Sequence, residues 1–331
     1  MRKIPATIIT GFLGAGKTSL LRHLVANAAG RRLALVINEF GELGIDRELL
    51  LGCGIESCRS DDVVELANGC ICCTVAEDFL PALEKLLDRP DPPEHILIET
   101  SGLALPKPLV QAFNWPEIKA RVTVDGVVAV IDAPALAAGR FADTTPELAH
   151  DNPLDEVFGD QLACADLVVL NKTDLTDAAT LDLAEREIGS RLRSQARHVK
   201  ATFGKVPPQL LLGLSAAAED DLASRPSQHD LEGEHDHDDF DMFVVTISAV
   251  RDPETLIDRL VAAARTHDIL RVKGFIEVAG KPLRMLVQGV GQRFRRDFDR
   301  PWGVGEPRLS RLVVIAERGV DREAVASALG A

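Results

Sequence analysis

The stretch IPATIITGFLGAGKT, from Ile4 to Thr18, decides the fold of this 331-residue chain. Its first part, up to Thr10, is mostly apolar or β-branched, as in a buried strand. Gly11–Thr18 then fits the P-loop pattern G-x-x-x-x-G-K-[ST], and the residues SLLRHLVANAAG that follow have helical spacing. A strand, a glycine-rich loop and a helix in this order predict a phosphate-binding site, where backbone N–H groups surround phosphates at the positive end of the helix.

Two side chains of this loop suit a nucleoside triphosphate. Lys17 is placed to reach the β- and γ-phosphates, and the Thr18 hydroxyl is placed to bind Mg²⁺. The alternative is a glycine-rich turn that binds nothing, which the order of strand, motif and helix disfavours. We therefore expect Lys17 and Thr18 to be catalytic.

Short, fully apolar runs recur after the P-loop. They span residues 33–38, 95–99, 127–132 and 166–171, with helical stretches near Phe79–Leu87 and Leu181–Leu192. Runs without apolar–polar alternation are typical of parallel strands covered on both faces. The sequence therefore predicts an α/β fold of the P-loop NTPase type, with a doubly wound, mainly parallel sheet that binds its ligands at the carboxyl ends of the strands.

Two of these runs end in residues typical of a GTP site. HILIE ends in Glu99, a carboxylate at a strand tip that can hold Mg²⁺ or its water, and we expect Glu99 to be catalytic together with Lys17 and Thr18. DLVVL is followed directly by NKTD, Asn171 to Asp174. The Asp174 carboxylate can accept both the ring N–H and the exocyclic amine of guanine, a pattern that adenine lacks. Alone, NKTD could be a turn that ends a strand, but the P-loop and Glu99 upstream favour a GTPase.

Composition and charge limit the partners. Aromatic residues make up 4% of the chain and Tyr is absent, which argues against binding nucleic acid by base stacking. The net charge of −14 would repel phosphate backbones and anionic membranes. Because no apolar run approaches the length of a membrane span, we expect a cytoplasmic protein with no nucleic-acid or membrane partner. In a reducing compartment, clustered cysteines favour metal binding or redox chemistry.

The length of the chain suggests two domains. We predict a P-loop GTPase domain over residues 1–223, an acidic, histidine-containing linker over 224–240, and a smaller α+β domain with antiparallel strands over 241–331. The linker includes His235 and His237, which could bind a cation loosely, but a solvated charged segment is the favoured interpretation.

Three of the six cysteines lie within four positions, in the stretch NGCICCTV. Thiolates at Cys70, Cys72 and Cys73 can converge on one borderline cation such as Zn²⁺ or Co²⁺. The candidates for a fourth ligand are a water or one of the residues Glu39, Glu42, Cys53 and Cys58. The alternatives are buried hydrophobes, a redox pair or thiols without a role, and adjacent cysteines are strained as a disulfide. Cys164 alone is expected to be a core residue.

The motifs GFLGAGKT, NEFGELGID, GCICCT, ETSGLALP and NKTD, in this order and spacing, resemble those of the CobW family of metal-handling P-loop GTPases. The resemblance covers about Ile4 to Leu222, and VKGF at Val272–Phe275 is similar to the second domain of the family. The overall likeness is greatest to the members associated with cobalamin biosynthesis.

The resemblance implies a role for each motif. Glu99 matches the Walker B carboxylate, the cysteines match a CxCC metal motif, and Glu39 matches an acidic residue near the metal. The predicted metal ligands are therefore Cys70, Cys72, Cys73 and Glu39. The predicted nucleotide-binding residues are Gly11, Gly14, Ala15, Gly16, Lys17, Thr18, Ser19, Asn171, Lys172 and Asp174.

The function that the resemblance implies is that of a GTP-dependent metallochaperone. It would bind Co²⁺ at the CxCC site in the Mg-GTP state and release it on hydrolysis to cobaltochelatase, or to another metal-receiving client, in cobalamin biosynthesis. Thiolates prefer Zn²⁺ to Co²⁺, so a zinc chaperone is the close alternative. A metal-buffering or sensing protein without delivery is a third possibility, and NKTD argues against a small-molecule kinase.

Overall fold

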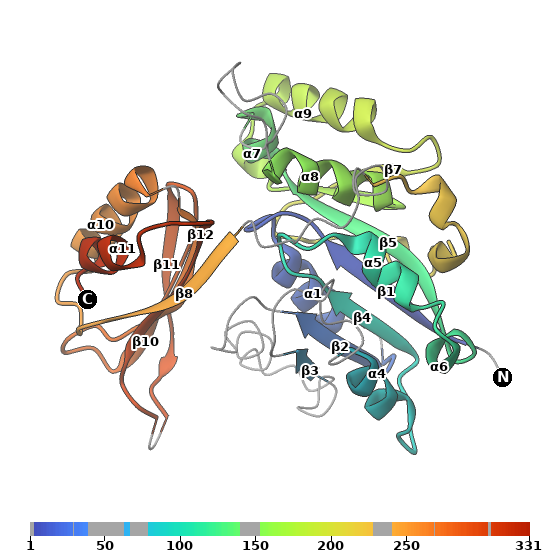
Figure 1. The fold of residues 1–331 in the computed structure, drawn as a ribbon, viewed down its shortest axis with the longest axis horizontal. Coiled ribbons are helices and arrows are strands. Elements are labelled where there is room, and N and C mark those ends of the chain that lie inside the picture. Colours follow the sequence, from blue (N-terminus) through green and yellow to red (C-terminus); the bar gives the residue numbers. More distant parts are fainter. Residues whose placement is uncertain are drawn as a thin grey trace. The chain divides into compact units, whose positions relative to one another are not determined.

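The computed structural model describes residues 3–28, 30–38, 63–66, 79–139, 153–227, 240–267, 269–303 and 306–331. These residues form two compact units, one holding those up to 227 and the other those from 240 onward (Figure 1). The predicted ligands Glu39, Cys70, Cys72 and Cys73 lie outside the described residues, as do Glu42, Cys53, Cys58, His235 and His237.

In the described residues, the first unit is built on a sheet of seven parallel strands in the order β3-β2-β4-β1-β5-β6-β7 (Figure 1). The strands are β1 (Ile4–Thr10), β2 (Leu33–Asn38), β3 (Val63–Leu66), β4 (His95–Glu99), β5 (Val122–Asp132), β6 (Leu167–Asn171) and β7 (Arg197–Lys200). β2, β3 and β4 lie on one side of β1, and β5, β6 and β7 lie on the other, so the chain changes sides of the sheet beside β1. The doubly wound parallel sheet predicted from the apolar runs is confirmed, and its switch point lies next to the P-loop.

Helices cover both faces of this sheet, which explains why the strands are apolar throughout. Ile96 and Ile98 of β4 pack in one buried cluster, and Leu97 between them packs in the other. The helices are α1 (Lys17–Ala26), α4 (Leu80–Leu87), α5 (Pro106–Ala112), α6 (Pro116–Lys119), α7 (Ala133–Ala137), α8 (Pro153–Cys164) and α9 (Ala178–Arg191). In the part of the chain that the structure describes, none of the helices is both long enough and apolar enough to cross a membrane.

The segment after β7 returns along the sheet and closes the first unit. It contains three short 3-10 turns, η4 (Pro208–Leu210), η5 (Ala218–Asp220) and η6 (Leu222–Ser224). The buried carboxylate of Glu219 accepts hydrogen bonds from Thr123 Oγ1 at 2.6 Å and from Val124 N at 2.9 Å. The Glu219 carboxylate of η5 thus joins this segment to the first residues of β5.

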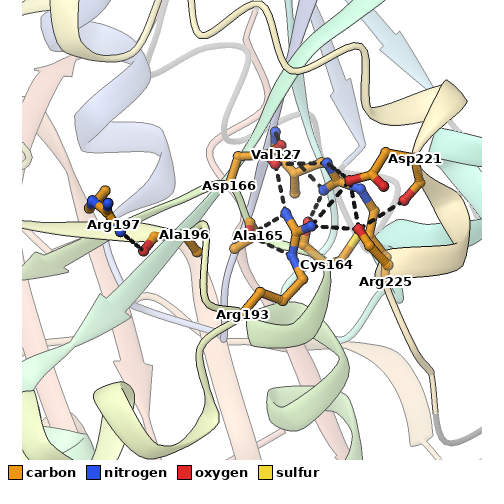
Figure 2. A network of polar contacts seen from close by, with 10 residues as sticks. Val127, Cys164, Ala165, Asp166, Arg193, Ala196, Arg197, Asp221 and Arg225 are labelled. Atoms are coloured by element: carbon orange, nitrogen blue, oxygen red, sulfur yellow. Dashed lines mark hydrogen bonds and ion pairs between the residues drawn. The ribbon is translucent and has the colours of Figure 1, made fainter.

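Arg225 fixes the end of the same segment. Its side chain is 1% exposed, and its Nη2 donates to Asp166 Oδ1 at 2.7 Å while Nη1 donates to the Cys164 carbonyl. Arg193 Nη2 donates to the same Asp166 oxygen at 2.7 Å (Figure 2). Residues 224–227, assigned to the linker from their polar composition, therefore pack against the first unit. The composition was misleading because arginine can be buried when a carboxylate partners it.

The Cys164 thiol lies beside this network, at the end of α8. The side chain is 1% exposed, and burial raises the pKa of the thiol to about 11 despite the adjacent Arg225 guanidinium. A thiol with such a pKa stays protonated at neutral pH and is a poor nucleophile or metal ligand. Cys164 is thus a core residue, as the sequence predicted.

We expect Arg225→Met to lower the free energy of unfolding by about 3 kcal/mol, the lower end for breaking a buried ion pair, because Arg193 still partners Asp166. Urea denaturation of the whole chain measures this. Arg197→Met is the matched control, because Arg197 is exposed and, among the described residues, its guanidinium donates to the carbonyls of Ser194 and Ala196. Figure 2 shows the bond to Ala196. Equal losses in the two variants would show that the buried network does not stabilise the fold.

The second unit is an antiparallel sheet with helices on one face. Its five described strands have the order β11-β10-β9-β12-β8. They are β8 (Phe240–Ile247), β9 (Ile269–Ile276), β10 (Leu283–Val290), β11 (Arg293–Pro301) and β12 (Ser310–Glu317). Apolar residues of α10 (Pro253–Thr266) and α11 (Arg322–Leu329) pack with those of the sheet in one buried cluster. The smaller α+β unit with antiparallel strands is confirmed.

Candidate nucleotide-binding site

The P-loop joins β1 to α1, and its glycines are required by backbone conformation and by packing. Gly11, Gly14 and Gly16 have φ angles of 131°, 72° and 108°, which L side chains rarely adopt. A Cβ at Gly11 would lie 2.1 Å from the Val130 carbonyl oxygen, and one at Gly16 would lie 2.3 Å from Asn171 Nδ2. The loop is therefore packed tightly against the ends of β5 and β6.

Lys17 is the first residue of α1, and its ammonium is held inside the loop. The residue is 6% exposed, and Nζ donates to the Gly11 carbonyl at 2.7 Å and to the Phe12 carbonyl at 3.4 Å. A buried ammonium needs partners, and phosphate oxygens are stronger acceptors than neutral carbonyls because both partners are then charged. The arrangement keeps a positive charge where an anion would enter the loop.

Thr18 and Glu99 meet at the switch point. The Thr18 hydroxyl donates to Glu99 Oε1 at 3.1 Å, and Glu99 is 5% exposed. They are brought together because Ile9 of β1 pairs in register with Glu99 of β4, which places the tip of β4 beside the P-loop. A hydroxyl and a carboxylate are oxygen donors of the kind that Mg²⁺ binds together with water and phosphates. The residues present therefore fit this cation.

Asn171, at the end of β6, holds two loops together. Its side chain is 1% exposed, Nδ2 donates to the Ala15 carbonyl at 2.8 Å, and Oδ1 accepts from Gly204 N at 2.9 Å. The amide is thus used to join the P-loop to the loop that follows β7. Asp174 lies in the turn η3 (Thr173–Leu175) and is exposed, so its carboxylate is accessible to a ligand.

Lys172 lies between these two residues in a left-handed conformation with φ of 61°. Its Nζ donates to the Gly14 carbonyl at 2.6 Å and to Asp132 Oδ2 at 2.7 Å. Asp132 ends β5, is 3% exposed, and accepts from Ala135 N at 2.9 Å through its other oxygen. The ion pair fixes Lys172 over the P-loop, so the residues NKTD contact the phosphate loop directly.

Sequence reasoning missed Asp132 and the loop of residues 201–204. The signal for Asp132 was present, since it ends an apolar run in the same way as Glu99. The loop follows β7, whose sequence RHVK is polar and lacks the apolar character of a strand. The structure holds this loop against NKTD, because the Thr173 hydroxyl donates to the Ala201 carbonyl at 3.0 Å.

The carboxyl ends of β2 and β3 lie at the same edge as the P-loop, since all these strands are parallel. Ile37 of β2 pairs in register with Glu99, and Asn38 pairs with Leu66, the last residue of β3. Glu39 follows Asn38 directly in the sequence, and Cys70 follows Leu66 after three intervening residues. Among the described residues, no group of three or more His, Cys, Asp or Glu could hold a metal ion.

Comparisons with known proteins identify the family of this chain. Residues 5–200 match a family described as "CobW/HypB/UreG, nucleotide-binding domain", and residues 240–331 match "Cobalamin synthesis protein cobW C-terminal domain". A protein from Sinorhizobium sp named "Zinc chaperone CobW" is 53% identical, with 99% of this chain and 97% of that protein covered. One of the same name from Pseudomonas aeruginosa is 51% identical, over 99% of this chain and 91% of the relative. The crystal structure of Zn(II)-bound YjiA GTPase from E. coli is 26% identical, covers 99% of this chain and 98% of its own, and has a TM-score of 0.45.

Proposed function

The chain belongs to the CobW/HypB/UreG family of P-loop GTPases, and we propose that it is a GTP-dependent metallochaperone whose cargo is Zn²⁺. The observation that carries this proposal is the contact of Thr18 Oγ1 with Glu99 Oε1 at 3.1 Å, at the edge where β2 and β3 also end. This contact supports the proposal that the phosphate end of the nucleotide binds beside the strands that lead to the predicted metal ligands.

Chain length limits how far the cysteine motif can be from this edge. Four residues of chain span at most about 14 Å, which bounds the distance between Leu66 and Cys70. Glu39 is adjacent in sequence to Asn38, whose neighbour Ile37 pairs with Glu99. We therefore propose Cys70, Cys72, Cys73 and Glu39 as metal ligands whose arrangement depends on what occupies the site at Thr18 and Glu99.

Zinc is proposed on ligand chemistry and on the relatives. A set of thiolates binds Zn²⁺ more tightly than Co²⁺ in the Irving–Williams order. The relatives from Sinorhizobium and Pseudomonas, with which this chain shares about half its residues, are both named zinc chaperones. Cobalt delivery to a cobaltochelatase is the second candidate, because the C-terminal unit matches the cobalamin synthesis family model.

The residues of the site have distinct parts in the proposed cycle. Asp174 accepts the two N–H groups of guanine, Lys17 neutralises the β- and γ-phosphates, and Thr18 and Glu99 hold Mg²⁺ or its water. Mg²⁺ would supply positive charge to the phosphate oxygens as the terminal bond breaks. Glu39, and Asp46 in the same motif NEFGELGID, are the proposed candidates for orienting the attacking water, and both lie outside the described residues.

Metal binding and GTP binding are then linked. If GTP brings the thiolates together, zinc must bind more tightly in the GTP state, and bound zinc must raise the affinity for GTP by the same factor. Hydrolysis weakens the metal site and favours transfer to a client protein. We place this exchange in the cytoplasm, where cysteines remain reduced and able to bind metal.

The test is the affinity for Zn²⁺, measured by chelator competition with a non-hydrolysable GTP analogue and Mg²⁺, and again with GDP and Mg²⁺. We expect at least about tenfold tighter binding with the GTP analogue, within the usual range of coupling between two sites. The triple substitution C70S/C72S/C73S should abolish the difference, whereas Cys164→Ala, which changes a buried thiol away from the motif, should preserve it. Equal affinities in both nucleotide states would reject the linked cycle, and the same titration with Co²⁺ ranks the two metals.

A further inference from the structure

Phe203 is an exposed aromatic residue beside the site, and neither the motifs nor the ion pairs described above account for it. Its side chain is 61% exposed, more than any other exposed large hydrophobic residue in the described part of the chain. Its φ of 54° lies in the left-handed region, which is unfavourable for a bulky side chain. An exposed apolar ring on a residue with a strained backbone costs stability in two ways, and backbone strain is typical of functional positions.

The loop that presents Phe203 is held on both sides by the residues of NKTD. Before it, the Thr173 hydroxyl donates to the Ala201 carbonyl at 3.0 Å and lies 3.2 Å from the Thr202 hydroxyl. After it, Gly204 N donates to Asn171 Oδ1 at 2.9 Å. Gly204 has a φ of 67°, and a Cβ there would lie 2.7 Å from Leu20 N on α1, so the backbone is packed against the helix of the P-loop. The ring is therefore carried on a fixed support.

Register places this loop beside Asp174. Leu170 of β6 pairs with Lys200 of β7, and the two strands are parallel, so the chain leaves both at the same edge. Asp174 lies four residues beyond Leu170, and Phe203 lies three residues beyond Lys200. The short loops that follow β6 and β7 are joined by hydrogen bonds, and they present the exposed Asp174 carboxylate and the exposed Phe203 ring.

We propose that the Phe203 ring stacks on the guanine base of bound GTP and GDP, an inference that rests on Asp174 as the residue that binds the guanine edge. Asp174 and Phe203 would have different roles because their side chains differ in chemistry. A carboxylate recognises the N–H groups in the plane of the base, and an aromatic face contacts the π surface that every base has. Phe203 therefore contributes affinity, and Asp174 contributes the choice of base.

An exposed ring could instead contact a client protein. The supporting bonds favour the nucleotide, because each of them connects the Phe203 loop to a residue of NKTD. A contact for a client protein would not require a strained backbone at a position beside Asp174. The cost of the backbone strain is offset if binding of the base requires the ring in one fixed position relative to Asp174.

The first experiment compares Phe203→Ala with Leu210→Ala, a matched control that removes another exposed apolar side chain, 49% exposed, from η4. Alanine keeps the cost of the positive φ, so the substitution removes the ring alone. We expect Phe203→Ala to weaken GDP binding by about 5- to 100-fold, the usual effect of removing one base-stacking aromatic. Binding of inorganic tripolyphosphate should be unchanged, and the loss in GTP hydrolysis should fall on KM rather than kcat. Unchanged GDP affinity in Phe203→Ala, or equal loss for GDP and tripolyphosphate, would overturn the proposal.

The second experiment is Phe203→Trp, which keeps a stacking face and adds a fluorophore. The chain has only two other Trp residues. We expect GDP to quench the new emission and tripolyphosphate to leave it unchanged, with GDP affinity at or above that of the unsubstituted chain. Emission that does not respond to GDP would overturn the proposal.

The variant Asp174→Ala tests the guanine-binding role of Asp174 separately from the stacking of Phe203. Loss of preference for GDP over ADP in that variant, with the Phe203 effects as stated, supports both. An unchanged preference would reject the guanine-binding role of Asp174, whereas the Phe203 results would still decide whether the ring stacks on a base.

Discussion

Replacing Lys17 with alanine should lower kcat/KM for GTP hydrolysis by about a thousandfold. The ammonium is 6% exposed and is held by the carbonyls of Gly11 and Phe12, so the structure reserves a positive charge within the phosphate loop. Removing a fixed donor from the position where negative charge develops costs about 10²–10³ in kcat, and weaker binding of the triphosphate adds to this loss. Single-turnover hydrolysis with radiolabelled GTP separates the two contributions.

The control for this variant is Lys200→Ala. Lys200 ends β7, its side chain is 48% exposed, and it pairs with Glu185 at 2.9 Å at the surface. Its loss should leave turnover within about twofold, because exposed ion pairs contribute little. A metal buffer that uses GTP only for stability would keep its metal transfer in Lys17→Ala, whereas the proposed chaperone should lose transfer together with turnover. Hydrolysis that survives Lys17→Ala would contradict the assigned role.

The second large effect is expected from Asp174→Asn. The exposed carboxylate can accept two N–H groups of guanine, and an amide in its place offers an N–H donor that faces another donor. Affinity for GTP should fall by about 10²–10³-fold, in keeping with sites that choose ligands by hydrogen bonds. Xanthosine triphosphate carries a carbonyl where guanine carries its amine, so its affinity should rise in the variant. Competition binding against labelled GDP measures both.

Asp177→Asn provides the matched control. Asp177 is an exposed residue that caps α9, where its side chain accepts from Thr180 N at 2.7 Å. Asparagine caps helices nearly as well as aspartate, so neither stability nor the choice of base should change. A variant at residue 174 that loses GTP without gaining xanthosine triphosphate would show that the carboxylate does not contact the base edge.

Much of the first unit could be predicted because its strands are buried on both faces. β4, with the sequence HILIE, has no alternation of apolar and polar residues, since Ile96 and Leu97 face different clusters that are both buried. The same rule failed for β7, whose residues Arg197 and His198 are exposed at the edge of the sheet. A strand covered by few neighbours has no reason to be apolar, so the pattern gave no signal.

The candidate site was predicted in part, for a related reason. Motifs identify residues whose roles depend on local spacing, such as Lys17 and Thr18. Asp132 and Phe203 act through neighbours distant in sequence, and only the sheet order brings them beside the P-loop. The boundary near residue 224 was misplaced because Arg225 resembles a linker residue until its partner Asp166 is known.

The Asn171 amide also bears on how the GTP and GDP states would differ. GDP keeps the base and two of the phosphates of GTP, so it meets the same loops, which the amide joins between the Ala15 carbonyl and Gly204 N. Loss of the terminal phosphate would alter the surroundings of Thr18 and Glu99, whereas the two bonds of the Asn171 amide would remain. We therefore expect GTP and GDP to meet these two loops in the same arrangement, so that the difference between the two nucleotide states is confined to the surroundings of Thr18 and Glu99.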